Sequence, residues 1–174
     1  MRFRSRAAKN AIAMAAVLCA GASNAAETAI LRLGALQLSY DATRWSAVRA
    51  GDGAFTMQPI GAIADELDPV DVTRVQARAT DSCETLARRK LSAPMYDGNP
   101  AGVAIEIAGV KALRMTADHG CRNAMPSGVV ICAPHRDKFY VLTASRPGCR
   151  SGANNLFSGI DPLHELASGI RFDP

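Results

Sequence analysis

The amino-acid sequence predicts an α+β fold, with an antiparallel sheet of about six or seven strands, one helix in the middle of the chain and another at its end. Three observations indicate this fold class. Short segments of alternating apolar and polar residues run through the chain, and a period of two is typical of half-buried strands. Turn residues separate these segments, which favours hairpins. Two segments carry the start and stop signals of helices.

The first strands are predicted to form a meander. Residues 30–40 alternate as one segment, and residues 45–49 alternate again after a turn at residues 41–43. The tripeptide Gly51-Asp52-Gly53 is a strong turn signal and leads into a further strand at residues 54–57. These short segments are expected to pair as antiparallel neighbours.

A further strand and the first helix follow. Residues 72–79 alternate with a period of two, which predicts a half-exposed strand. A helix is predicted over residues 82–91, with Asp81 as its N-cap and Glu84 closing a capping box. Pro94 ends this helical pattern, because proline removes a backbone donor and disfavours continuation of the helix.

The second half of the mature chain contains two predicted hairpins. Residues 103–107 pair with residues 110–116 in the first hairpin. Residues 128–132 pair with residues 139–144 in the second, and residues 134–138 form its polar turn. Both hairpins extend the predicted antiparallel sheet.

The chain is predicted to close with a second helix. Asp161 is its cap and Pro162 its first residue, a position where the missing N–H of proline costs nothing. Gly169 is expected to stop the helix, and residues 170–172 to pack down as the last segment. The apolar stripe of this helix consists of Leu163, Leu166 and Ala167.

The N-terminus is typical of an exported protein. A basic start, an apolar run at residues 11–22 and the small residues Ser23-Asn24-Ala25-Ala26 predict a secretory signal peptide over residues 1–26. The apolar run is too short for the roughly 20 residues that cross a bilayer, so no stable membrane anchor is expected after cleavage. Residues 27–174 are then expected to form a single mature domain.

Removal of the leader changes the charge of the protein. The whole chain has 20 Lys and Arg residues against 16 Asp and Glu residues, and its formal net charge is +4. Four of the basic residues and none of the acidic ones lie in the leader, so the mature domain is formally neutral. This balance offers no support for binding of nucleic acid.

The mature chain retains four cysteines: Cys83, Cys121, Cys132 and Cys149. An even number in an exported protein predicts two disulfides, for which three connectivities are possible. Cys121 and Cys149 each follow a strand that should end at the same sheet edge, which favours a Cys121–Cys149 bond and leaves Cys83 to reach Cys132. An alternative follows from the position of Cys83 at a helix start, where a lowered thiol pKa would suit a nucleophile or a redox sensor.

The ends of the mature chain resemble the PsbP-like fold, which is found in the photosystem II extrinsic protein, in Ran-binding relatives and in bacterial envelope proteins. Residues 36–45, LQLSYDATRW, are similar to the opening strands of that fold, although Asp41 stands where its members often have proline. Residues 161–172, DPLHELASGIRF, are similar to its terminal helix and final Arg-Phe. The resemblance implies an α/β/α sandwich used for binding or assembly. Its members share no active site, so it implies no catalytic residue.

Few residues are candidates for chemistry. The sequence contains no HxxxH or HExxH pair, no GxSxG elbow and no phosphate-binding glycine motif, so we expect no metal and no cofactor. Asp118 and His119, close to Cys121, form the most site-like group, although a histidine exposed in a loop is the alternative. His135 is interpreted as turn surface, and His164 is placed in the first turn of the last helix.

These observations favour a non-enzymatic binding or accessory protein of the bacterial periplasm or extracellular space. Such a protein would associate with another envelope protein through a sheet face, a sheet edge or a loop end. A small hydrolase or thiol-redox enzyme that uses Cys83 or His119 is one alternative. An inhibitor or immunity protein is another, since disulfides would hold its binding loops rigid.

Overall fold

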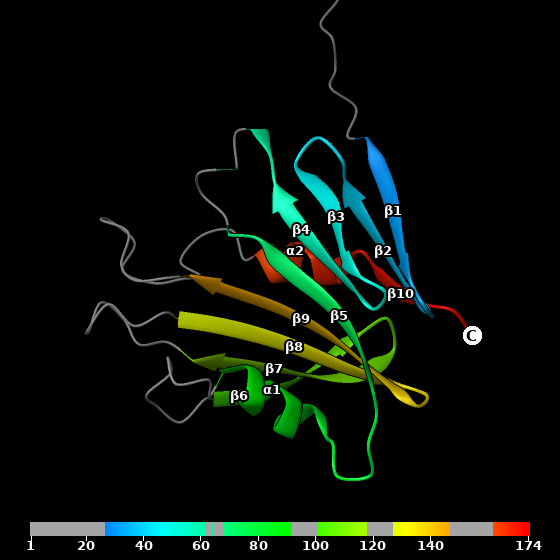
Figure 1. The fold of residues 1–174 in the computed structure, drawn as a ribbon, viewed down its shortest axis with the longest axis vertical. Coiled ribbons are helices and arrows are strands. Elements are labelled where there is room, and N and C mark those ends of the chain that lie inside the picture. Colours follow the sequence, from blue (N-terminus) through cyan, green and yellow to red (C-terminus); the bar gives the residue numbers. More distant parts are fainter. Residues whose placement is uncertain (1–26, 62–63, 65–67, 92–100, 118–126, 147–161) are drawn as a thin grey trace, which may run out of the picture.

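The structure is a computed structural model that describes residues 27–61, 64, 68–91, 101–117, 127–146 and 162–174. In these residues the chain forms two antiparallel sheets, with ten strands between them, and two helices (Figure 1). Neither helix is long and apolar enough to cross a membrane. The predicted signal peptide, residues 1–26, lies outside the described residues.

The smaller sheet joins the two ends of the described chain. Its strands are β1 (Thr28–Leu33), β2 (Leu36–Asp41) and β10 (Ile170–Phe172), in the order β1-β2-β10. The prediction of one segment over residues 30–40 was therefore wrong, because a two-residue turn at Gly34 and Ala35 divides it. Gly34 has a φ of 63°, a left-handed conformation that glycine adopts without strain.

The larger sheet contains seven strands in the order β3-β4-β5-β9-β8-β7-β6, every neighbouring pair antiparallel. Both hairpins predicted in the second half of the chain are present. The strands are β3 (Trp45–Gly51), β4 (Ala54–Pro59), β5 (Val70–Gln76), β6 (Ala101–Ile107), β7 (Val110–Ala117), β8 (Ser127–His135) and β9 (Lys138–Arg146).

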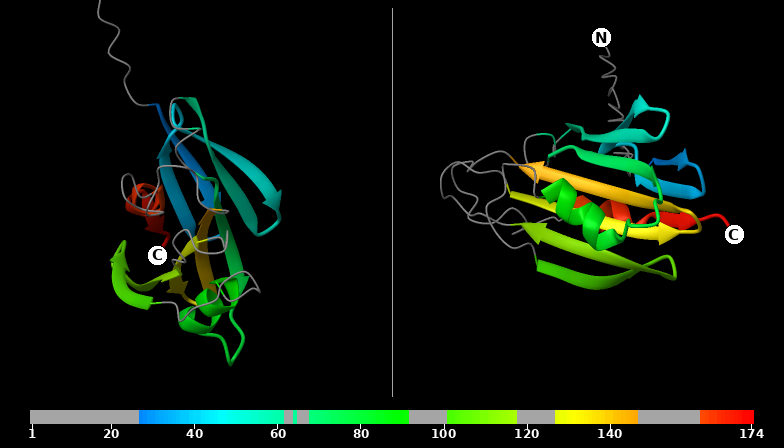
Figure 2. Two further views of the ribbon diagram at one scale, coloured as in Figure 1. Left: turned by 90° about the vertical axis from the view of Figure 1, so that its left-hand side faces the viewer. Right: turned by 60° about the horizontal axis from the view of Figure 1, so that its bottom comes forward.

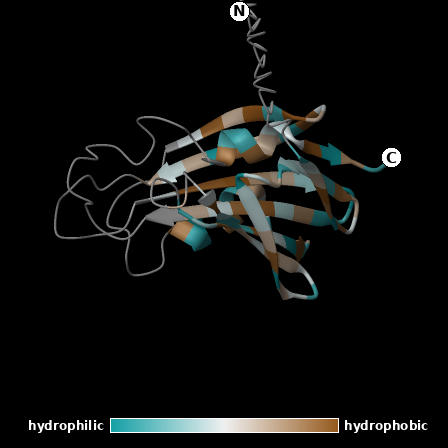
Figure 3. Ribbon diagram, turned by 90° about the horizontal axis from the view of Figure 1, so that it is seen from above, coloured by the Kyte–Doolittle hydropathy of each residue, from teal (hydrophilic) through white to brown (hydrophobic). Residues whose placement is uncertain are grey.

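The two faces of the larger sheet bury different cores, as the alternation along β8 illustrates. Val130 and Cys132 face the helix α1 (Cys83–Leu91), whereas Val129 and Ile131 face the helix α2 (Pro162–Ser168) and the smaller sheet. Figure 2 shows α1 and α2 on opposite sides of the sheet. Apolar and polar residues alternate along the strands in Figure 3, as expected for strands whose successive side chains point to opposite faces.

The prediction of an antiparallel sheet of six or seven strands is confirmed, since the larger sheet is antiparallel and has seven strands. The molecule is richer in β-structure than predicted. One face of the larger sheet is covered by α2 together with the three-stranded sheet. Leu36 and Leu38 of β2 belong to the same core cluster as Leu163 and Leu166 of α2. The layer that covers this face of the larger sheet therefore consists of both strands and a helix.

Gly169 ends α2, as predicted, but for a different physical reason. A left-handed C-cap was expected, whereas Gly169 is not among the described glycines with a positive φ. A Cβ atom at this position would instead lie 2.0 Å from the carbonyl oxygen of Ser39. The amide of Ser39 donates a hydrogen bond of 3.0 Å to the carbonyl of Gly169, so the absence of a side chain lets the two backbones meet.

Candidate functional site

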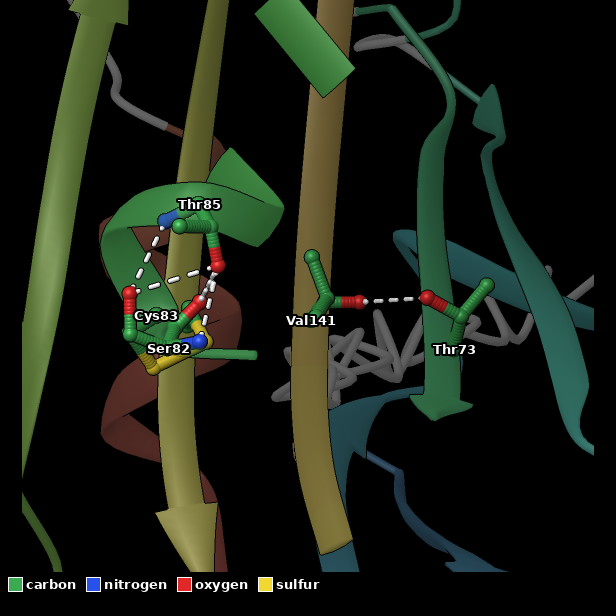
Figure 4. Close-up of a disulfide and its surroundings, with 6 residues drawn as sticks. Thr73, Ser82, Cys83, Thr85 and Val141 are labelled. Carbon is green, nitrogen blue, oxygen red and sulfur yellow. Dashed lines mark hydrogen bonds between the residues drawn. A yellow bond between two sulfur atoms is a disulfide. The ribbon is translucent and has the colours of Figure 1, made fainter. Parts of the chain in front are cut away.

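The structure links one of the predicted cysteine pairs. Cys83 at the start of α1 and Cys132 in β8 form a disulfide, with their Cα atoms 5.4 Å apart (Figure 4). Cys132 is fully buried, and Cys83 is partly buried against the same core. The bond fastens α1 to the centre of the larger sheet. Cys121 and Cys149 lie outside the described residues, as do the candidate site residues Asp118 and His119.

The start of α1 is capped by a different residue from the one predicted. The hydroxyl of Ser82 accepts the amide of Thr85 at 3.1 Å, and the amide of Ser82 donates to the Thr85 hydroxyl at 2.8 Å (Figure 4). The capping box is therefore Ser82 with Thr85 rather than Asp81 with Glu84. Asp81 stands one residue earlier, where its carboxylate accepts the amide of Arg78 at 3.2 Å.

Two of the three histidines, His135 and His164, fall within the described residues. His135 was expected to be turn surface, but its ring stacks on Phe172 of β10, with centroids 4.7 Å apart. Its Nε2 atom is buried without a hydrogen-bond partner in the described part of the chain. The stacking fastens the β8–β9 hairpin to the last strand. No described group of three His, Cys, Asp or Glu residues is placed to hold a metal ion.

A hollow of about 260 Å³ opens between α2 and strands β6 to β8. Its apolar wall comes from Ile105, Ile107 and Ile131 of the sheet and from Ala167 of α2. Sequence reasoning missed this site, because its residues come from three separate stretches of the chain. The remaining lining residues are polar, charged or at the hairpin turn, namely Glu106, Ala108, Arg114, His164, Ser168 and Arg171.

The charge lining the hollow is mainly positive. Arg114 and Arg171 contribute two guanidinium groups, and Glu106 is the one carboxylate among its described lining residues. Arg171 donates through Nη1 to the carbonyls of Ile170 at 2.6 Å and Ser168 at 3.3 Å. These acceptors are neutral, so they orient the guanidinium at the end of α2 without cancelling its charge.

A second hollow, of about 280 Å³, lies on the other side of α2 near β2 and β3. Its acidic groups already have partners. Asp41 accepts hydrogen bonds from the hydroxyl and amide of Thr43, which lower the pKa of its carboxyl below the usual value. Glu165 accepts from Arg44 at 3.1 and 3.0 Å and from the indole of Trp45 at 3.1 Å. We interpret this hollow as part of the contact that holds α2 against β2 and β3.

One edge of the larger sheet borders the first hollow. β6 is the outermost strand, and its outer side pairs with no strand in the described residues (Figure 1). Val103 in the middle of β6 is 58% exposed, and Glu106 is the only charged residue of the strand. The opposite edge, β3, also carries one charged residue, Arg49, but it has a register irregularity between Arg49 and Gly51. A register irregularity of this kind protects an edge from pairing, and β6 pairs with β7 in regular register.

Comparisons with known proteins add little about function. The sequence matches no protein-family model and no curated protein. A crystal structure of a protein from Bacteroides thetaiotaomicron VPI-5482 is similar to this chain, with a TM-score of 0.48 and 8% sequence identity. The match covers 80% of this chain and 46% of the Bacteroides chain, so this chain spans less than half the length of that protein.

Proposed function

We propose that this chain is an exported, non-enzymatic binding or accessory protein of the bacterial envelope, and that it associates with another envelope protein through the outer edge of β6. The observation that carries the proposal is the exposed, nearly uncharged edge strand with Val103 at its centre. An extended segment of a partner can add to such an edge, because the unpaired N–H and C=O groups provide backbone hydrogen bonds.

The leader and the cysteines support the proposed location. The signal peptide predicted over residues 1–26 would direct the chain out of the cytoplasm. The Cys83–Cys132 disulfide is compatible with an oxidising compartment such as the periplasm or the extracellular space. The PsbP-like resemblance remains a prediction, and the use of that fold for binding or assembly agrees with the proposed role.

The enzyme alternatives receive less support from the described residues. A thiolate nucleophile at Cys83 needs a free sulfur, and this sulfur is bonded to Cys132. Ser168 lines the hollow with His164, but its hydroxyl donates to the carbonyl of Glu165 at 2.7 Å. A serine nucleophile would instead need to donate its proton to the histidine base.

Site-specific photo-crosslinking in the envelope of the producing bacterium tests the proposed function. A photoreactive residue at Glu106, on β6, should give one discrete adduct with another envelope protein, and the same residue at the exposed Lys90 of α1 should not. In the Glu106-labelled chain, Val103→Lys should abolish the adduct because a lysine blocks edge pairing, whereas Val103→Thr should preserve it. An adduct that survives Val103→Lys, or the same adduct from Lys90, would contradict the proposal.

A further inference from the structure

The edge of β6 and the first hollow form one continuous surface. Ile105 and Ile107 are residues of the edge strand and also line the hollow between β6 and α2. Val103 lies on the same face of β6, because side chains two residues apart point the same way. A strand that added to β6 would therefore place every second side chain on the α2 side of the sheet, beside the mouth of the hollow.

The hollow has the chemistry to receive an acidic side chain. Its apolar wall suits the methylene groups of a side chain, and Arg171 stands at the end of α2. A guanidinium has five N–H donors, and the hydrogen bonds to Ser168 and Ile170 use only its Nη1 group. The Nε and Nη2 groups have no acceptor among the described residues. They can therefore bind a carboxylate while Nη1 continues to hold the end of α2.

A second copy of this chain fits the surface less well. If two β6 strands paired in an antiparallel manner about a twofold axis, each would present its own Val103, Ile105 and Ile107 on the shared face. These three side chains are all apolar, so none of them would set a carboxylate against Arg171. The remaining donors of Arg171 favour a partner segment of a different sequence that includes an acid.

We propose that the partner contributes an extended segment in which an acidic residue, flanked by strand-forming residues, adds to β6 and sets its carboxylate against Arg171. This inference rests on the proposed function, and it defines the chemistry of the bound segment. The edge of β6 supplies backbone hydrogen bonds that any extended segment can use. The hollow makes the binding selective for sequence, because Arg171 binds a negative charge at one position along the added strand.

Three synthetic peptides of alternating Val and Thr, with Glu, Gln or Lys at one central position, test the inference by fluorescence anisotropy. The mature, oxidised protein should bind the Glu peptide about fivefold more tightly than the Gln peptide, and the Lys peptide most weakly. Arg171→Gln should remove the preference for Glu over Gln. The matched control is Arg32→Gln, at an exposed arginine of β1, which should preserve the preference.

The outcomes separate this inference from the proposed function. Equal affinities for the Glu and Gln peptides, both abolished by Val103→Lys, would overturn the role of Arg171 and leave edge binding intact. If no peptide bound and Val103→Lys had no effect on crosslinking, both proposals would fail. A dimer in sedimentation experiments that Val103→Lys dissociates would overturn the inference in favour of self-pairing. The circular-dichroism spectrum of Arg171→Gln should match that of the wild-type protein, which reports that the variant is folded.

Discussion

Gly169 approaches Ser39 so closely that a Cβ atom on the glycine would lie 2.0 Å from the Ser39 carbonyl oxygen. The contact joins the end of α2 to β2, and the hydrogen bond from Ser39 to Gly169 holds the two backbones together. Because the clashing atom belongs to the backbone, a side chain at residue 169 would force the helix and the strand apart.

Gly169→Ala should therefore destabilise the protein by about 3 kcal/mol, the upper end of the usual range for substitutions that overpack a core. Urea denaturation followed by the fluorescence of Trp45, the only tryptophan, measures this loss. The control is Gly109→Ala. Gly109 has a φ of 77° but nothing within 4 Å of an added Cβ, so only backbone strain of about 1 kcal/mol is expected. Equal losses in the two variants would contradict the steric explanation.

Glu165→Gln should loosen the opposite side of α2. The substitution removes the charge that pairs with Arg44, at 3.0 Å, while Trp45 can still donate to the remaining amide oxygen. Both charged side chains are about one-third exposed, so solvent screens the pair, and we expect a loss of about 1 kcal/mol in unfolding free energy.

Glu84→Gln is the matched control for this substitution. Glu84 pairs with Arg88 one turn later on the exposed surface of α1, where such pairs contribute only about 0.3–0.5 kcal/mol. Chemical denaturation of the two variants gives the comparison. A smaller loss for Glu165→Gln than for Glu84→Gln would show that the Arg44 contact does not hold α2.

Removal of the Cys83–Cys132 disulfide should weaken the whole domain. The bond closes a sequence separation of 49 residues, for which the chain-entropy model predicts about 4 kcal/mol of stabilisation. The double variant Cys83→Ala/Cys132→Ala, compared with the wild-type protein in urea, measures this quantity.

Thiol counting on the denatured, unreduced mature protein complements that experiment. Two predicted disulfides leave no free thiol, so no colour should develop with a thiol reagent. Two or more free thiols would refute the two-disulfide prediction and return support to a redox role for a cysteine pair.

Asp137 should make the β8–β9 hairpin sensitive to acid. Hydrogen bonds from Lys138 and Gln76 lower the pKa of its carboxyl from 3.8 to about 2. Since the folded-state pKa lies below the unfolded one, the stabilisation is present above pH 3.8 and is lost as the pH falls towards 2. Asp137→Asn should thus lower the melting temperature at neutral pH, and the difference from wild type should shrink below pH 3.8.

The control for Asp137→Asn is Asp52→Asn, which removes a carboxylate from the exposed turn between β3 and β4. Melting temperatures of the three proteins across this acid range separate the local hydrogen bonds of Asp137 from a general change in net charge. A difference between Asp137→Asn and wild type that stayed constant down to pH 2 would contradict the lowered pKa.

The missed turn at Gly34 had a signal in the sequence. The buried leucines occupy odd positions before it, Leu31 and Leu33, and even positions after it, Leu36 and Leu38. Such a switch from odd to even positions indicates a turn, because in a continuous strand the residues that face the core are all odd-numbered or all even-numbered. The N-cap was harder to predict, since Asp81 and Ser82 both have side chains suited to capping.

The sequence by itself determined the local elements of this protein. Alternation predicted the β-strands, short turn signals predicted both hairpins of the second half, and Pro162 and Gly169 delimited the last helix. Each of these signals lies within a few residues of the structure that it specifies, so one sequence is enough to find it.

Only the tertiary structure decided which elements meet. Pairing of β5 with β9, the sharing of one face by α2 and the smaller sheet, and the hollow that brings Ile105 close to Arg171 all join residues distant in the chain. Such contacts depend on how apolar faces are buried against one another, and many partners satisfy the same local pattern. The candidate site exists only at this level, because no single segment contains it.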